Sequence, residues 1–331
     1  MRTAVASLIC LGALLCTAQT TWHDPSPHTL RFVEVQPGVK LEVLDWGGHG
    51  RDVVLLAGYL TAHAYDDFAV KLSHLCHVYG ITRRGFGASS RPDSGYDAER
   101  SGQDILQVID ALKLSKPVLA GHSFGGQDLN WLGAKHSDRL SGLIYLNSAE
   151  DATLNAGDYG VRPPEGESLP AALRETHPPQ PISFQAYREW QLRVHGVAFP
   201  ESELRQLYAV EPDGAMGRHL VPGRVRDAMF QRIQKPDYAA IRIPVLAFFA
   251  TPAIISDQMK LYDAKRNDER TALRQKYVSD LAIVNRHMYD LKKGVPSARL
   301  IALPGANFYI FLSNETDLLR EIELFLKSPP N

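Results

Sequence analysis

Short apolar runs alternate with amphipathic segments along the first half of the chain. Apolar runs of about four to eight residues between turn residues are typical of strands, and apolar positions recurring with the helical period are typical of helices. The clearest helix covers residues 97–114, where Ile105, Val108, Ile109 and Leu112 share one face. Strands and helices in alternation predict a mainly parallel sheet with helices on both faces.

In chain order, the predicted strands cover residues 31–35, 41–45, 53–56, 76–82, 117–120, 140–146, 244–250 and 299–303. The predicted core helices cover residues 66–75, 97–114, 124–136 and, as one long stretch, about 256–293, and a final helix begins at 313. The run at 53–56 is apolar throughout and ends at Gly58, as buried strands do. The pattern therefore predicts an α/β core.

The alternation stops between residues 151 and 240. Proline-rich pieces there separate helical segments such as 183–194 and 201–210, and no strand pattern is present. We therefore predict a helical cap at 151–240, inserted into a core made of residues 30–150 and 241–328.

Composition and charge narrow the choice of partner. The 331 residues are 44% hydrophobic with a formal net charge of -1, which suits a large domain with an insertion. A near-neutral balance gives no electrostatic reason to expect nucleic acid. The sequence has no paired-His helix motif, no Cys pair outside the N-terminal run, and no dinucleotide or phosphate loop. We expect a small-molecule substrate or ligand, no metal, no cofactor, and Cys76 buried without a disulfide.

The N-terminus has the pattern of a secretory signal over residues 1–18. A short positive region precedes an apolar run at 3–16, which is too short for a comfortable membrane span. Small residues predict cleavage after Ala18, and hence a secreted or periplasmic protein without an integral membrane segment. A lipoprotein with Cys16 as the lipidated residue is a weaker alternative, because Leu15 is large for that position.

The segment 121–125, Gly-His-Ser-Phe-Gly, carries the clearest chemical signal. It stands between an apolar predicted strand and a predicted helix, which is the setting of a serine nucleophile on a sharp turn. Gly121 and Gly125 let the backbone pass close on both sides, and Gly126 lets the helix pack tightly. Such a turn lifts the Ser123 hydroxyl out of the sheet at the positive end of the helix. The alternative is that Ser123 is only the turn residue of a strand–loop–helix crossover.

Three segments together resemble the α/β-hydrolase family, over residues 32–326. Residues 53–58 resemble its third strand, which leads to the oxyanion loop; residues 82–89 resemble the loop after its fourth strand; residues 118–126 resemble its nucleophile elbow. The segments occur in the family's order and spacing, so the resemblance implies an α/β-hydrolase fold with a helical cap. The fold alone does not determine the substrate.

The resemblance also implies an oxyanion hole. The family uses the backbone N–H of the residue after the nucleophile, here Phe124, and a second N–H after the third strand, here Tyr59 with Leu60 as the alternative. The family often has His-Gly in that loop where this chain has Ala57-Gly58, but a backbone donor does not depend on the imidazole. Tyr59 can also be an aromatic residue of the pocket wall, and the two roles are compatible.

The family's acid follows either of two late strands. After the sixth predicted strand the matching position is Asn147, which can orient a histidine but cannot stabilise its charged form as a carboxylate does. After the seventh, the next carboxylate is Asp257, and Glu150 and Asp151 are further candidates. A solvated or capping role is the alternative for each of these three carboxylates.

The family's catalytic histidine is missing. The resemblance places it after Asn307, following the last predicted strand, where this chain has Phe308. Phenylalanine cannot accept the serine proton, and a serine hydroxyl without a base is a poor nucleophile near neutral pH. His122 points away from Ser123 in the usual elbow geometry. Other histidines that could substitute, each with a surface or packing role as the alternative, are His63, His177, His195, His219 and His287.

Two functional hypotheses follow. The first is a serine esterase that hydrolyses ester-like small molecules with a degenerate triad, using Ser123 as nucleophile. The second is a catalytically impaired pseudoenzyme that keeps the pocket and binds a small apolar ligand. The intact elbow favours the first, and Phe308 favours the second.

Overall fold

The computed structural model describes residues 22–162, 164, 168–170, 173, 178 and 181–328. The predicted signal at residues 1–18 and the candidate base His177 lie outside the described residues. Within the described part of the chain, no helix is both long and apolar enough to cross a membrane.

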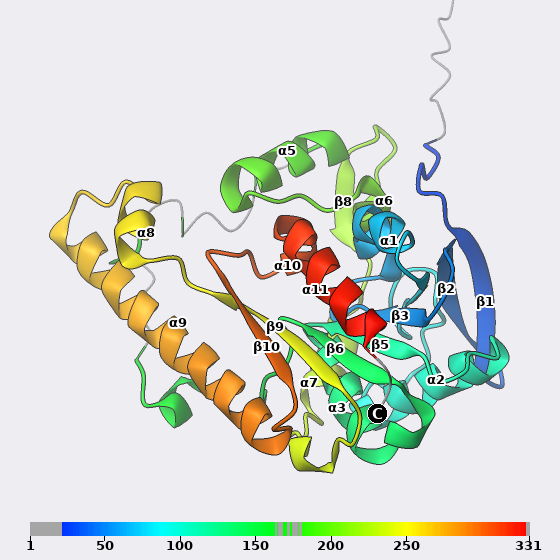
Figure 1. Ribbon diagram of the computed structural model, residues 1–331. Helices are drawn as coiled ribbons and strands as arrows, with labels where there is room; N and C mark the ends of the chain where they lie inside the picture. The colour runs from blue at the N-terminus through cyan, green and yellow to red at the C-terminus, as the bar shows by residue number, and fades with distance from the viewer. Residues whose placement is uncertain are drawn as a thin grey trace, which may run out of the picture.

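A single sheet forms the centre of the molecule, with its strands in the order β1-β2-β4-β3-β5-β6-β9-β10 (Figure 1). β2 pairs antiparallel with β1 and β4, and all other neighbours are parallel. The strands are β1 (Thr29–Gln36), β2 (Val39–Gly47), β3 (Asp52–Leu56), β4 (His77–Ile81), β5 (Val118–His122), β6 (Gly142–Leu146), β9 (Val245–Thr251) and β10 (Arg299–Pro304). This is the mainly parallel sheet that the alternating pattern predicts.

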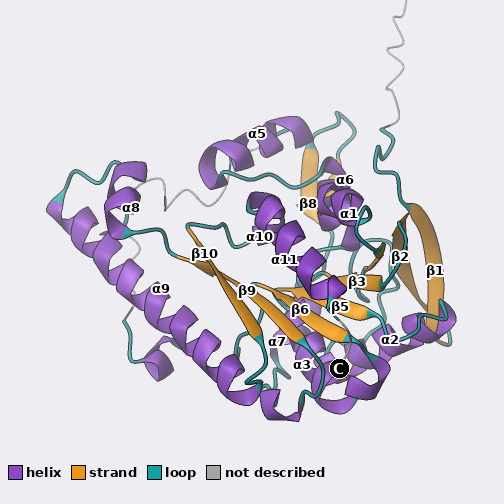
Figure 2. Cartoon of the chain, in the orientation of Figure 1, coloured by secondary structure: helices purple, strands orange, loops and turns teal. Residues whose placement is uncertain are grey.

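Helices cover both faces of this sheet (Figure 2). Val53 and Leu55 on β3 belong to one buried cluster and Val54 and Leu56 to another, because successive strand residues point to opposite faces. Burying such a side chain completely stabilises the fold by about 1.5–3 kcal/mol. The first cluster includes residues of α1 (Asp66–Leu72) and α11 (Glu315–Lys327), and the second includes residues of α2 (Ala98–Ala111), α3 (Gly125–Lys135) and α9 (Asn267–Gly294).

The segment between β6 and β9 is mainly helical where it is described. Its helices are α5 (Phe184–His195), α6 (Glu201–Leu207), α7 (Gly223–Phe230) and the short η3 (Ala156–Tyr159) and η5 (Tyr238–Ala240). The predicted helix at 201–210 is wrong at its end, because β7 (Tyr208–Val210) pairs with β8 (Met216–His219) in an antiparallel sheet of its own. The partner strand β8 lies outside residues 201–210, so the pattern within that segment does not reveal the pairing. Pairing with β8 makes residues 208–210 a strand in place of the last helical turn.

The long helix predicted at 256–293 is two helices, α8 (Ile255–Leu261) and α9. Asp263 lies between them with a φ of +46°. This left-handed conformation does not continue a right-handed helix, and aspartate is one of the residues that tolerate it. α9 then packs along β9 (Figure 1).

Candidate active site

Ser123 stands on a sharp turn between β5 and α3, with a φ of +52°. Neighbouring glycines make the turn possible. A Cβ on Gly125 would lie 2.5 Å from the Leu56 carbonyl oxygen, and one on Gly126 would lie 2.1 Å from the Ser148 carbonyl oxygen. The close packing holds a non-glycine residue in a conformation that costs about 1–3 kcal/mol, which is typical of functional sites.

The Ser123 side chain faces a cavity of about 330 Å³. Among the residues described, no hydrogen bond to the Ser123 hydroxyl is found. The lining contains no Asp, Glu, Lys or Arg. The lining residues are Tyr59, Leu60, His122, Ser123, Tyr187, Trp190, Gln191, His195, Phe199, Leu204, Leu207, Tyr208, His219, Phe308 and Tyr309. A cavity of this size suits a small molecule.

The loop after β3 abuts the elbow backbone. A Cβ on Gly58 would lie 2.6 Å from the Phe124 nitrogen and 2.7 Å from the Ser123 Cβ. Tyr59 lines the cavity, with its ring edge-on to Phe86 at 5.2 Å and stacked on His219 at 6.1 Å. Tyr59 is therefore a wall aromatic, and its N–H and that of Phe124 stay predicted oxyanion donors.

Asn147, which the resemblance places at the acid position, contacts two other segments. It follows β6 with a φ of +55°, and its Oδ1 accepts a hydrogen bond from the Ala250 N–H at 2.9 Å. Its Nδ2 donates to the Phe308 carbonyl at 3.3 Å. The amide thus connects β6, β9 and the loop after β10, a role that a carboxylate could fill only in part, because it has no N–H to donate.

Phe308 occupies the loop after β10 and lines the same cavity as Ser123. Its side chain is exposed, and its ring lies edge-on to the His122 ring at 4.8 Å. Its carbonyl oxygen lies 3.1 Å from His122 Nε2, in addition to the contact with Asn147. The loop is therefore fixed through its backbone, while it presents a ring that cannot accept a proton.

His122 lies beneath this loop and is almost fully buried. Burial lowers its pKa to about 4, although the hydrogen bond to the Phe308 carbonyl acts in the opposite direction. The ring is therefore neutral at pH 7, and it donates from Nε2. Its Nδ1 is buried without a partner in the described chain.

Two candidate histidines reach the cavity and two do not. His195 and His219 line it. The His219 ring is held between Tyr59 and the Val221 backbone, whose N–H lies 3.2 Å from Nδ1. His287 Nε2 instead lies 2.7 Å from the Tyr159 hydroxyl. His63 is 2% exposed, lies among carboxylates and does not line the cavity, so it is not placed to act as the substitute base there.

None of the candidate carboxylates contacts Ser123 or a lining histidine in the described structure. Asp257 is exposed in the first turn of α8 and lies 3.9 Å from Lys260. Asp151 accepts a hydrogen bond from the Thr153 N–H at 3.1 Å, which is a capping role. Glu150 lines a separate cavity of about 220 Å³ with Asn147, His287 and Phe308, and burial raises its pKa.

Most residues of the cavity wall are not among the site residues predicted from the sequence. Tyr187, Trp190 and Phe199 come from the segment around α5, and Tyr309 directly follows Phe308. Their aromatic side chains were the available signal, but periodicity does not tell a cavity wall from a buried helix face.

Comparisons with known proteins agree with this geometry. The model of the alpha/beta hydrolase family matches residues 53–318. The AB hydrolase superfamily protein YisY of Bacillus subtilis is 33% identical over 138 residues, which are 40% of this chain and 50% of that protein. Epoxide hydrolase A of Mycobacterium tuberculosis is 30% identical over 129 residues, 36% of this chain and 38% of that protein. The chain thus spans half or less of the length of these curated relatives.

The similarity in fold to solved structures covers more of the chain than the sequence matches do. The crystal structure of E-2-(acetamidomethylene)succinate hydrolase superposes with a TM-score of 0.63 and 17% identity, covering 91% of this chain and all of that one. At this identity the likeness shows the fold alone. With the family match, the sheet order and the serine elbow in agreement, the chain belongs to the alpha/beta hydrolase family.

Proposed function

We propose that the protein hydrolyses small, uncharged esters through Ser123, at a slow rate because its triad is degenerate. One observation carries this proposal: Ser123 holds the strained φ of +52° at the wall of an aromatic cavity whose lining has no Asp, Glu, Lys or Arg. A strained serine held by glycine contacts has the position of a serine nucleophile on a strand-to-helix turn.

In the proposed reaction, the Ser123 oxygen bonds to the acyl carbon, and the alcohol leaves with the serine proton. Water then cleaves the acyl-enzyme and releases the acid. The N–H groups of Phe124 and Tyr59 stabilise the intermediate oxyanion. Because Phe308 cannot carry the proton, water or a cavity imidazole such as His219 must do so. We expect a rate enhancement close to that which remains when a catalytic triad has lost one member, about 10³–10⁴-fold over the reaction in water.

The test is hydrolysis of p-nitrophenyl butyrate by the parent and by Ser123→Ala. We expect slow turnover that the substitution lowers further, because the alanine variant keeps the oxyanion donors but has no nucleophile. p-Nitrophenyl hemisuccinate is the matched anionic substrate, and we expect it to react more slowly because the cavity offers no cation. Turnover that is equal in the parent and in Ser123→Ala would reject Ser123 as nucleophile.

A second candidate is binding of a small apolar ligand without turnover. The position of Phe308 favours it, since the phenyl ring adds apolar surface to the cavity and its loop is anchored by His122 and Asn147. Fluorescence titration of Trp190, a lining residue, with short aliphatic alcohols and esters tests binding apart from chemistry. Saturable binding without ester turnover would support this candidate over the first.

We also propose that residues 1–18 direct export. N-terminal sequencing of the exported protein is expected to begin at Gln19. Retention of the full-length chain inside the producing cell would contradict it.

A further inference from the structure

Two histidines and two aspartates form a cluster apart from the serine cavity. Asp24 and His28 precede β1, His63 lies in η1 (Ala62–Tyr65), and Asp66 begins α1. One ligand atom from each of the four lies within 4.8 Å of the others. Imidazole nitrogen and carboxylate oxygen are both ligands of Zn²⁺. We call these four residues the Asp–His cluster.

The spacing of the cluster fits a small tetrahedral ion. Bonds of about 2.0–2.1 Å put tetrahedral ligand atoms about 3.3 Å apart. His63 Nδ1 lies 3.3 Å from Asp24 Oδ2 and 3.3 Å from Asp66 Oδ2. The His28 ring has Nδ1 at 3.0 Å from Asp66 Oδ1 and Nε2 at 3.9 Å from Asp24 Oδ2. The two His63 separations match that value, and the four ligand atoms, all within 4.8 Å of one another, would need only small side-chain shifts to bind a common ion.

Other side chains orient Asp66 from outside the cluster. Its Oδ1 accepts hydrogen bonds from the Ser26 hydroxyl at 2.8 Å and from Trp46 Nε1 at 3.2 Å. Its Oδ2 accepts one from the Ser202 hydroxyl at 2.5 Å. Ligating carboxylates in metal sites are oriented in this way.

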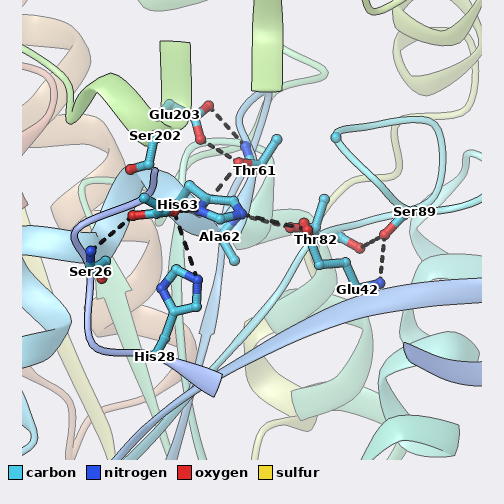
Figure 3. A network of polar contacts seen from close by, with 12 residues as sticks. Ser26, His28, Glu42, Thr61, Ala62, His63, Thr82, Ser89, Ser202 and Glu203 are labelled. Atoms are coloured by element: carbon cyan, nitrogen blue, oxygen red, sulfur yellow. Dashed lines mark hydrogen bonds and ion pairs between the residues drawn. The ribbon is translucent and has the colours of Figure 1, made fainter. Parts of the chain in front are cut away.

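Glu42 supplies an independent indication. It is 0% exposed, and neither carboxylate oxygen has a hydrogen-bond partner in the described structure. His63 Nε2 lies 3.5 Å from Oε1, within ion-pair distance, and this nitrogen too has no hydrogen bond in the described structure (Figure 3). A histidine that binds zinc through one nitrogen characteristically donates its other N–H to a carboxylate. Glu42 lies beside the second ring nitrogen of His63, which is the position of such a carboxylate.

The charge balance also favours a cation. Asp24, Glu42 and Asp66 bring three carboxylates into a region with two imidazoles, and the last two carboxylates are almost fully buried. Buried carboxylates are costly unless they are paired or coordinate a metal. A cleft of about 740 Å³, lined by Asp24, Ser26, Asp66 and Ser202 among others, gives an ion access from solvent.

We propose that Asp24, His28, His63 and Asp66 bind one Zn²⁺ ion in a closed, structural site. Two imidazoles favour Zn²⁺ over Mg²⁺ or Ca²⁺, which prefer oxygen ligands. Four protein ligands leave no open position, as in structural zinc sites. These ligands come from two separate segments, each with one aspartate and one histidine, and so they form no metal-binding motif in the sequence.

The site would tie the N-terminal segment to the loop that follows the oxyanion residues. Thr61, two residues before His63, donates its N–H to Glu203 of α6 at 3.0 Å, and its hydroxyl also bonds Glu203 (Figure 3). Ser202, next to Glu203, bonds Asp66. An ion bound by Asp24, His28, His63 and Asp66 would hold the N-terminal segment against the loop that contains Thr61 and His63. That loop and Asp66 are in turn hydrogen-bonded to α6.

The test uses tag-free protein dialysed against a chelator and then against metal-free buffer. Metal content is measured by mass spectrometry after adding Zn²⁺ and removing the excess, and Tm is followed across a Zn²⁺ titration. Co²⁺ reports the coordination geometry through its visible absorption. The variants are Asp24→Asn and His28→Gln, which remove ligands from the N-terminal segment, and the matched control is His23→Gln, an exposed neighbour outside the cluster.

We expect one Zn²⁺ per chain, a Tm that rises with the logarithm of Zn²⁺ concentration, and a tetrahedral Co²⁺ spectrum. Asp24→Asn and His28→Gln should each weaken binding by at least about 10-fold, and His23→Gln should not. Folded parent protein that takes up no Zn²⁺ and shows no Tm shift would overturn the proposal, leaving an ion-pair network around a protonated His63. Uptake that both ligand variants retain would overturn it too, since the ion would then bind elsewhere.

Discussion

Replacing Phe308 by histidine is predicted to raise esterase activity. The Phe308 carbonyl is anchored by His122 Nε2 at 3.1 Å and Asn147 Nδ2 at 3.3 Å, so the loop is held independently of the side chain. The phenyl ring lines the Ser123 cavity, and an imidazole is smaller than a phenyl ring. The new side chain should therefore enter the cavity without rearrangement of the loop.

The size of the gain depends on Asn147. A competent base contributes about 10²–10⁴-fold, but an amide in place of the triad acid costs about 10⁴-fold in kcat. Because the cost of the amide can cancel most of the contribution of the base, we expect a gain of at most about 10-fold from Phe308→His alone and about 10²-fold or more when Asn147→Asp is added. Aspartate keeps the acceptor for the Ala250 N–H and loses the donor to the Phe308 carbonyl, which costs about 1 kcal/mol of stability.

The assay is kcat and KM for p-nitrophenyl butyrate with the parent, the single variant and the double variant. The gain should appear in kcat, because the base acts in the transition state. The double variant with Ser123→Ala is the control and should be inactive. A parent as fast as the double variant would show that another group is the base. Two folded but inactive variants would show that the cavity has diverged toward binding.

Three further predictions concern stability and the candidate acid. Gly126→Ala places a Cβ 2.1 Å from a backbone carbonyl oxygen, so urea unfolding should show a loss of about 2–4 kcal/mol; Gly223→Ala, with nothing within 4 Å of the added Cβ, is the control and should be neutral or slightly stabilising. Burial lowers the pKa of His122 to about 4 from 6.5, so the unfolded chain binds a proton between these values that the folded chain does not. Its stabilising contribution is complete above pH 6.5 and falls by about 3 kcal/mol as the pH drops through 4. His122→Gln should remove that part of the pH dependence, and an unchanged profile would refute the assignment. Asp257→Asn should leave ester hydrolysis within about twofold of the parent, because its nearest charged partner is a neighbouring lysine on the surface; a loss of about 10²-fold or more would restore it as the triad acid.

The sequence was sufficient for the sheet and the elbow because both leave local signals. Apolar runs such as 53–56 mark buried strands, and glycines around Ser123 mark a turn that only small residues permit. The family match and the sheet order confirm the fold. The hairpin that begins at Tyr208 left no such signal, because its strands are short and half-exposed.

The polar clusters could not be predicted because they join distant segments. His63 follows the predicted oxyanion loop and is a candidate substitute base in the sequence. Its surroundings are set by Asp24 and Glu42, which the topology brings from other strands and loops. Asn147 likewise looked like a degraded acid, and only the structure shows its amide holding Ala250 and Phe308. Contacts between segments decide the role of a polar side chain, and one sequence does not contain them.

The most direct test of the central claim is labelling with a fluorophosphonate probe, followed by mass spectrometry of the peptides. The account predicts slow formation of a single adduct on Ser123, no adduct in Ser123→Ala, and faster labelling in the variant that combines Phe308→His with Asn147→Asp. Absence of an adduct on Ser123 in that folded double variant would contradict the claim that this elbow carries a nucleophile.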